Sequence, residues 1–139
     1  MSAQDAVRKA SKGFYAALNS MLKGDASPLA GIWSHGVAVT TLHPIGGRQV
    51  GWRKVKETWQ QVAKSMSDGR VKLNDQLIRV VGDLAYEVGI EKGYSVMGGQ
   101  KVAIEHRVTN IYRREAGGWK IVHHHADVSP AMLDVVSRL

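Results

Sequence analysis

Three consecutive histidines, His123, His124 and His125, are the densest group of chemically active side chains in the sequence. An imidazole can accept or release a proton near neutral pH, and it can also bind a metal ion. Side chains alternate between the two faces of a β-strand, so the three rings cannot converge on one point. The alternation predicts that His123 and His125 share the face of Ile121, whereas His124 points the opposite way. At least one imidazole is therefore placed to enter a cavity, and packing or an interface role is the alternative for each.

A metal site is not predicted from these residues. His123 and His125 would supply only two ligands on one face, and none of the six histidines lies in an HExxH motif or a similar signature. The absence of cysteine excludes thiolate metal sites, disulfides and cysteine nucleophiles together. The glycine-rich turns join strands and do not open helices, which argues against a nucleotide site. We therefore expect neither a metal nor a cofactor.

The histidines belong to the last of several strands that follow residue 70. Runs of β-branched and aromatic residues at 71–81, 84–94, 101–113 and 119–127 are separated by Gly82-Asp83, Gly98-Gly99 and Gly117-Gly118. Glycine supplies the positive φ that a tight reversal needs, so this pattern predicts a meander of four long antiparallel strands.

On each of two of these strands, polar side chains share one face. Glu87 and Glu91 alternate with apolar residues on the first, and Arg107 and Thr109 do so on the second. Two arrangements remain open: the apolar sets pack against the helices, or they form a dimer surface while the polar sets line the interior. Glu91 and Arg107 are accordingly either a polar pair in a pocket or a solvated cross-strand pair.

Helical periodicity dominates the first half of the chain. Apolar residues recur at a spacing of 3.6 over residues 3–22, and again over residues 52–66 with Trp59 on the sheet-facing side, up to a break at Asp68-Gly69. Between these helices, Ser27 is expected to cap a short helix with Pro28 in its first turn. A strand over 36–42 and a turn at 43–47 follow, and a last short helix begins at Pro130.

Length and composition indicate one domain over residues 1–139, of the α+β class because helices come first and strands later. The net charge of +7 comes from scattered lysines and arginines, which favours a solvated basic surface over nucleic-acid binding. No apolar run is long enough to cross a bilayer, and the first residues lack a secretory signal. We expect a cytoplasmic protein without a membrane partner.

The order of these elements resembles the SnoaL-like branch of the nuclear transport factor 2-like superfamily over nearly the whole chain. The resemblance implies a cone-shaped α+β domain, in which a strongly curved antiparallel sheet wraps a long N-terminal helix and leaves a pocket at the wide end. The last hairpin is also similar to the association domain of calcium/calmodulin-dependent kinase. The motifs that carry the resemblance are His43-Pro44-Ile45-Gly46-Gly47, Gly51-Trp52, the segment from Gly82 to Tyr86 and the segment from Gly118 to His125.

Ketosteroid isomerases share this fold, and their general base is an aspartate just before a proline at the end of the first strand. That place is similar to His43-Pro44, so the resemblance implies that His43 is a general base or acid. A turn histidine that hydrogen-bonds locally is the alternative. Positions similar to the isomerase's oxyanion donors hold Ala17, His35 and Trp59, and steroid isomerisation is therefore not expected.

These observations predict a pocket for a small organic molecule, anionic ones included, in a homodimer that buries surplus apolar sheet surface. As an enzyme, the protein would use His43, with His35 and Tyr15 orienting the substrate or a water and Arg107 engaging a carboxylate or enolate oxygen. This is the metal-independent chemistry of an isomerase, cyclase or dehydratase. As a binding or dimerisation module, it would hold a metabolite without turnover. The expected ligand-contacting residues are Tyr15, Trp33, Trp59, Glu91, Arg107, Thr109 and His124.

A test separates the two interpretations. A hydrogen-bonded His43 in a closed cleft favours catalysis, whereas a mostly apolar pocket without buried polar neighbours favours binding alone.

Overall fold

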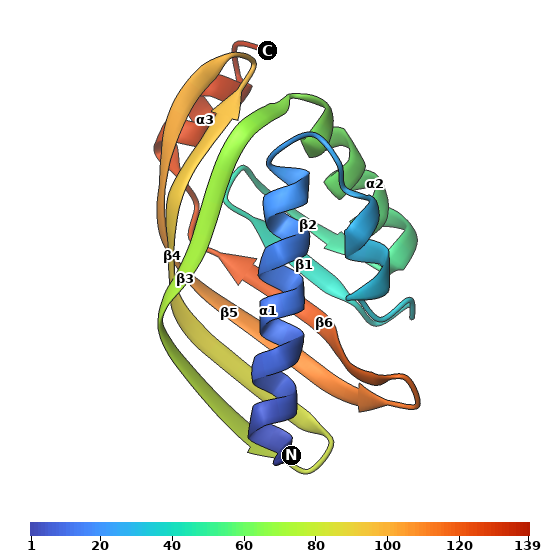
Figure 1. The fold of residues 1–139 in the computed structure, drawn as a ribbon. Coiled ribbons are helices and arrows are strands. Elements are labelled where there is room, and N and C mark those ends of the chain that lie inside the picture. Colours follow the sequence, from blue (N-terminus) through green and yellow to red (C-terminus); the bar gives the residue numbers. More distant parts are fainter.

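The computed structural model describes all 139 residues. Six strands form one sheet in the order β2-β1-β6-β5-β4-β3. Figure 1 shows that the sheet is strongly curved and wraps α1, with α2 on the same side. None of the helices has the length and apolar character that crossing a membrane requires. The elements are α1 (Ala3–Met21), the 3₁₀ helix η1 (Ser27–Gly31), β1 (Thr40–His43), β2 (Gly46–Val50), α2 (Trp52–Lys64), β3 (Met66–Val81), β4 (Leu84–Met97), β5 (Gln100–Glu115), β6 (Gly118–Ala126) and α3 (Pro130–Val136).

The long helix α1 begins at a side-chain cap and buries one stripe. Ser2 Oγ accepts a hydrogen bond of 3.0 Å from the backbone N–H of Asp5, which satisfies one of the free donors of the first turn. Buried residues recur along the face that packs against the sheet, and Gly24, with φ of 101°, allows the chain to turn away after the last turn. The buried residues of α1 are Val7, Ser11, Phe14, Tyr15, Ala17, Leu18 and Met21.

The segment between the two long helices differs from the expectation. Ser27 is the first residue of η1 and not its cap, and its backbone N–H donates to Asp25 Oδ1 at 3.0 Å. The strand expected over 36–42 is confined to β1, and β2 was not expected at all. Pro44 and Ile45 form a tight reversal between them, so two short strands pair on either side of a turn that the sequence pattern placed at 43–47.

The break expected at Asp68-Gly69 is a β-bulge inside β3. The register of β3 with β4 shifts between Ser67 and Arg70, and Asp68 has a φ of 51°. Aspartate tolerates this left-handed conformation, so the strand bends and continues without ending. A second register shift lies between Asn74 and Leu77. Two bulges in one strand account for the strong curvature of this part of the sheet.

Glycines in β4 allow β3 to approach closely at the bends. A Cβ atom added to Gly93 would lie 2.0 Å from the carbonyl oxygen of Arg70. A side chain at this position would therefore force the two strands apart.

We expect Gly93→Ala to destabilise the protein by at least about 1–3 kcal/mol, because the added methyl group cannot be accommodated without moving the backbone of β3. Urea unfolding would measure the change. Gly31→Ala is the matched control, since a Cβ atom there has no neighbour within 4 Å. Equal stability of the two variants would show that the close approach at Gly93 is not a constraint on the sheet.

The sequence left open whether the apolar or the polar residues of β4 and β5 face inward, and the two strands differ in this respect. On β4 the polar set faces inward: Glu87 is 0% exposed and Glu91 4%, while Leu84 and Tyr86 are exposed on the outer face. On β5 the apolar set faces inward, and Arg107 points outward. Each strand therefore follows a different one of the two alternatives.

A bulge in β6 changes which histidine faces the interior with Ile121. The register of β5 with β6 shifts so that Ile111 pairs with His123 but Tyr112 pairs with Ile121. Ile121 and His124 are both buried, whereas His125 is exposed. The prediction that His123 and His125 share the face of Ile121 is therefore wrong, because strict alternation is interrupted within the strand.

Candidate functional site

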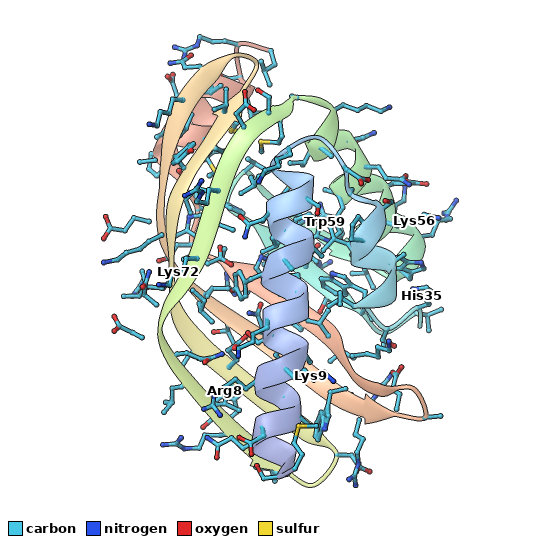
Figure 2. All side chains as sticks on the ribbon, in the orientation of Figure 1. Arg8, Lys9, His35, Lys56, Trp59 and Lys72 are labelled. Carbon is cyan, nitrogen blue, oxygen red and sulfur yellow. The ribbon has the colours of Figure 1, made fainter.

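A cavity of about 60 Å³ lies where α1, α2, α3 and the concave face of the sheet meet. Ten of its fifteen lining residues are hydrophobic, among them three methionines whose flexible side chains can change its shape. Trp59, between α1 and α2 in Figure 2, forms part of the wall. The polar lining residues are His43, Glu91, His106 and His124.

The strand register brings the polar residues together. Glu91 on β4 pairs directly with His106 on β5, and Glu87 pairs with Asn110 four residues further along the two strands. Asn110 in turn pairs with His124 on β6. Because directly opposed side chains on one face lie about 4.5–5.5 Å apart at Cβ, these pairs are within hydrogen-bonding reach.

Glu91 is the centre of the first buried network. Its Oε1 is 2.8 Å from Nε2 of His106, and its Oε2 accepts a hydrogen bond of 2.8 Å from the hydroxyl of Tyr15. Burial acts to raise the pKa of Glu91, but the hydrogen bond from His106, the nearby imidazoles and the Tyr15 hydroxyl outweigh it and lower the pKa. Burial, together with the charge of Glu91, raises the pKa of Tyr15 well above its ordinary value. Tyr15 is thus a hydrogen-bond donor and not a base.

Glu87 is the centre of the second network. Its carboxylate accepts hydrogen bonds from Gln76 Nε2 at 2.6 Å, from the Tyr112 hydroxyl at 2.8 Å and from Asn110 Nδ2 at 3.0 Å. Asn110 Nδ2 also lies 3.1 Å from the Tyr15 hydroxyl, which joins the two networks. The donors that a buried carboxylate requires are therefore supplied by two strands, β3 and β5.

His43 borders the cavity without a hydrogen-bond partner. Its ring is 4% exposed and packs edge-to-face on Trp59, with ring centroids 4.6 Å apart. Nε2 of His43 and Nε1 of Trp59 are fully buried and unpaired. Burial, and to a smaller extent the neighbouring His124, lowers the pKa of His43 to about 3. The ring is neutral at physiological pH.

His124 lies between the core and the cavity. Its Nδ1 is 2.6 Å from Oδ1 of Asn110, and its ring packs against Phe14 with centroids 5.3 Å apart. The His43 ring is 6.3 Å away. Burial is the main reason that the pKa of His124 is lowered to about 4, although the charge of Glu91 acts against it.

Two expected ligand contacts on the helical side lie elsewhere. Trp33 is 1% exposed in the core, stacked on Trp52, and does not line the cavity. His35 is exposed at the periphery (Figure 2), where it stacks on Trp52 with centroids 4.4 Å apart and its Nε2 is 2.6 Å from the Ala30 carbonyl oxygen. His35 is outside the site because the segment that follows it is not a strand.

Two more expected contacts lie on the outer face of β5. The Arg107 side chain is 83% exposed and forms a bidentate ion pair with Asp127, with Nε 2.8 Å from Oδ2. Thr109 faces the same side, on a shallow outer depression. Strand parity is the reason, since both have odd numbers and the inward residues of β5 have even ones. Glu91 therefore pairs with His106 and not with Arg107.

Sequence reasoning did not single out His106 or Asn110. The signal was present, because both lie at even positions between Ile104, Val108 and Tyr112, the apolar residues that define the inward face of β5. No group of three or more His, Cys, Asp or Glu side chains in the structure is arranged to hold a metal ion. The chemistry available at the cavity is that of imidazoles and one carboxylate.

Residues 7–132 match the family model of the SnoaL-like domain. The chain belongs to this family. No curated protein matches the sequence. The cone-shaped α+β fold expected from the resemblance is confirmed by solved structures of nuclear transport factor 2-like and cystatin-like folds.

Three solved structures illustrate the likeness of this SnoaL-like domain to known proteins. A suspected dehydratase of the nuclear transport factor 2-like family from Streptomyces avermitilis is 26% identical, with a TM-score of 0.80 over 92% of this chain and 96% of that chain. A suspected calcium/calmodulin-dependent protein kinase type II association domain from Thiobacillus denitrificans is 25% identical, with a TM-score of 0.69 over 86% and 92%. A protein with a cystatin-like fold from Caulobacter vibrioides is 20% identical, with a TM-score of 0.74 over 97% of both chains, and this likeness shows the fold alone.

The burial of His43 in this SnoaL-like domain makes stability depend on pH. The unfolded chain binds a proton at His43 near the ordinary pKa of 6.5, but the folded chain does so only near 3. Stability is thus retained above pH 6.5 and lost as the pH falls toward 3, because protons favour the unfolded chain in that window. The pKa of His124 is also lowered, so His124 adds to the loss of stability as the pH falls.

We expect His43→Gln to remove about 2 kcal/mol of the stability loss between about pH 7.5 and about pH 5. Urea unfolding at both pH values would measure it, with the exposed His35→Gln as the control that leaves the difference unchanged. An identical pH dependence in wild type and His43→Gln would mean that the folded His43 ring is protonated as readily as in the unfolded chain.

Proposed function

We propose that this protein binds a small organic molecule in the cavity beside His43 and carries out metal-independent acid–base chemistry of the isomerase or dehydratase type. The observation that carries the proposal is the His43 imidazole, which is almost completely buried at the cavity wall with no partner for either ring nitrogen. A buried polar group without a hydrogen bond costs about 1–3 kcal/mol. Nε2 of His43 is sealed by protein atoms, whereas Nδ1 is not, so Nδ1 is the ring nitrogen at which a ligand can supply the missing hydrogen bond.

The second acid–base group in this proposal is His106 with Glu91. A carboxylate that holds an imidazole in place is a recurring arrangement for proton transfer, since it fixes the ring and stabilises its charged form. His106 lines the cavity, and its Nε2 is occupied by Glu91, which leaves Nδ1 as the nitrogen that can exchange a proton with a ligand. Two imidazoles on one cavity allow one to accept a proton while the other donates one.

For a dehydratase, the steps balance without a further reactant. His43 removes the proton from the carbon next to a carbonyl group, the electron pair forms a carbon–carbon double bond, and the bond to the β-hydroxyl group breaks. His106, in its charged form beside Glu91, donates the proton of its other ring nitrogen to the departing hydroxyl, which leaves as water, so that His43 ends charged and His106 neutral. The 26% identity with a suspected dehydratase over almost the whole of both chains supports this reaction class.

The surroundings of His43 combine features of both interpretations. Most of the cavity wall is apolar and His43 has no hydrogen bond within the chain, which favours binding. The buried pair of Glu91 and His106 on the same cavity favours catalysis. Tyr15 supports Glu91 by a hydrogen bond but does not line the cavity, so its expected contact with a ligand is not supported. The expected role of Arg107 toward a ligand carboxylate is not supported, because its side chain lies on the outer face.

The alternative function is that of a non-catalytic binding or dimerisation module. It is favoured by the similarity to a suspected kinase association domain and by apolar side chains on the outer face of the sheet, where Leu77 is 42% and Tyr86 43% exposed. A second copy packed on this face would remove them from water. Light scattering at micromolar concentration tests the homodimer, and a monomer would exclude it.

We expect His43→Gln to abolish turnover while retaining ligand binding, because glutamine keeps a polar side chain but cannot take a proton near neutral pH. Ligands would first be found by thermal shift with small β-hydroxy ketones, hydroxy acids and aromatic ketones. Each hit would then be assayed for loss of water through the ultraviolet absorption of the conjugated product. His35→Gln is the control, as the same change at an exposed histidine outside the cavity.

The pH dependence provides a further check of this assignment. The neutral His43 ring is the active form, so this ring is active at neutral pH and its protonation reduces activity as the pH falls toward its pKa of about 3. Unchanged turnover in His43→Gln would refute the role of His43. Hits that bind to both proteins and react with neither would favour the non-catalytic module.

A further inference from the structure

The orientation of the Asn110 side chain is determined by its neighbours. Its Nδ2 lies 3.0 Å from Oε1 of Glu87, and a carboxylate that already receives hydrogen bonds from Tyr112 and Gln76 needs a donor there. The amide nitrogen must therefore face Glu87, and the amide oxygen must face the other way. This oxygen is the atom that lies 2.6 Å from Nδ1 of His124.

An amide oxygen only accepts hydrogen bonds, so Nδ1 of His124 carries the hydrogen atom. At neutral pH the ring is uncharged, since burial lowers the pKa of His124 to about 4. The other nitrogen, Nε2, is then a bare acceptor. It has no hydrogen-bond partner in the chain and, unlike Nε2 of His43, it is not sealed by protein atoms. The hydrogen bonds therefore run from Glu87 through Asn110 to His124. Since His124 lines the cavity, this series ends in an acceptor that a ligand can reach.

The other polar groups at the cavity do not favour an anion. Glu91 places a carboxylate on the wall, and the lining contains no lysine or arginine. The indole N–H of Trp59 is sealed by protein atoms, like Nε2 of His43, so Trp59 contributes only ring surface to the wall, 5.8 Å from the ring of His124. An uncharged molecule with a hydroxyl group satisfies this set, because the hydroxyl can donate to an imidazole nitrogen while its apolar part contacts the hydrophobic lining.

We propose that the cavity takes an uncharged, hydroxyl-bearing organic molecule and that Nε2 of His124 accepts the hydrogen bond of this hydroxyl group. Asn110 and Glu87 are positioning residues, which act by holding His124 in the tautomer with hydrogen on Nδ1. This inference rests on the proposed function, since it takes the cavity beside His43 to be the ligand site. It adds a specificity-determining residue and a substrate class to that function.

The tautomer can be measured without a ligand. In protein with ¹⁵N-labelled histidine, two-bond correlations between ring hydrogens and nitrogens distinguish a protonated nitrogen from a bare one, and the loss of one ring's signals in His124→Gln assigns His124. We expect wild type at neutral pH to show His124 protonated at Nδ1 and bare at Nε2. Asn110→Leu should lose this single form, whereas Thr109→Val, the adjacent outward-facing position on β5, should keep it. If Asn110→Leu does not fold, the wild-type spectrum decides alone.

The ligand class is tested with 2-propanol and acetone, which have the same carbon skeleton but of which only the alcohol donates a hydrogen bond. We expect 2-propanol to shift the Nε2 signal of His124 and acetone to leave it in place, while both shift the methyl signals of the cavity methionines Met21, Met66 and Met132. His124 protonated at Nε2, or an Nε2 signal that ignores the alcohol while the methionine signals respond, would overturn the inference and leave the proposed function standing. Methionine signals that respond to neither probe would overturn both.

Discussion

The burial of two carboxylates on the concave face of β4 is the constraint on which the rest of the structure depends. Glu87 and Glu91 are almost completely removed from water. An isolated buried carboxylate is strongly unfavourable, and truncating one partner of a buried charged pair typically costs about 3–5 kcal/mol. Three elements therefore contribute donors: α1 gives Tyr15, β3 gives Gln76, and β5 gives all the others, which are His106, Asn110 and Tyr112.

This requirement also selects the strand register. If β5 slipped by one residue relative to β4, His106 and Asn110 would turn to the solvent and both carboxylates would lose their partners on β5. The same slip would turn the inward apolar residues Ile104, Val108 and Tyr112 outward, so polar and apolar residues of β5 favour the same register. The polar interior thus specifies one pairing of the sheet, and the same pairing places His106 and His124 at the cavity. Stability of the fold and composition of the candidate site share one cause.

How much of this could be predicted from sequence depended on the kind of pattern involved. The helices α1 and α2 and the long strands were predictable, because apolar periodicity and glycine turns are local signals. The inward direction of Glu87 and Glu91 was not predictable. An alternating strand has one polar and one apolar face, and only tertiary contacts show which of the two is buried. The bulges in β3 and β6 were missed for a related reason: Asp68 resembles a turn residue, and nothing in the sequence between Trp119 and His125 marks the register shift.

The same distinction holds for the site. His43 was placed correctly at the end of the first strand through resemblance, and its position at the cavity follows from the structure. His35 and Arg107 were expected nearby but lie on the surface. The position of His35 is set by the path of a loop, and the direction of the Arg107 side chain is set by its odd position in β5. β1, which carries His43, pairs with β2 on one side and in parallel with β6 on the other.

This parallel pairing has a consequence for how the protein folds. Thr40 and His123, which meet across it, are 83 positions apart in the chain. Closing so long a loop has an entropic cost, and contacts of high sequence separation slow folding. During synthesis β1 has no partner except the short hairpin strand β2 until the last strand has been made. The wall formed by His43 and His124 is therefore the last part of the interior to close, after the meander of β3, β4 and β5 has already formed from neighbours in sequence.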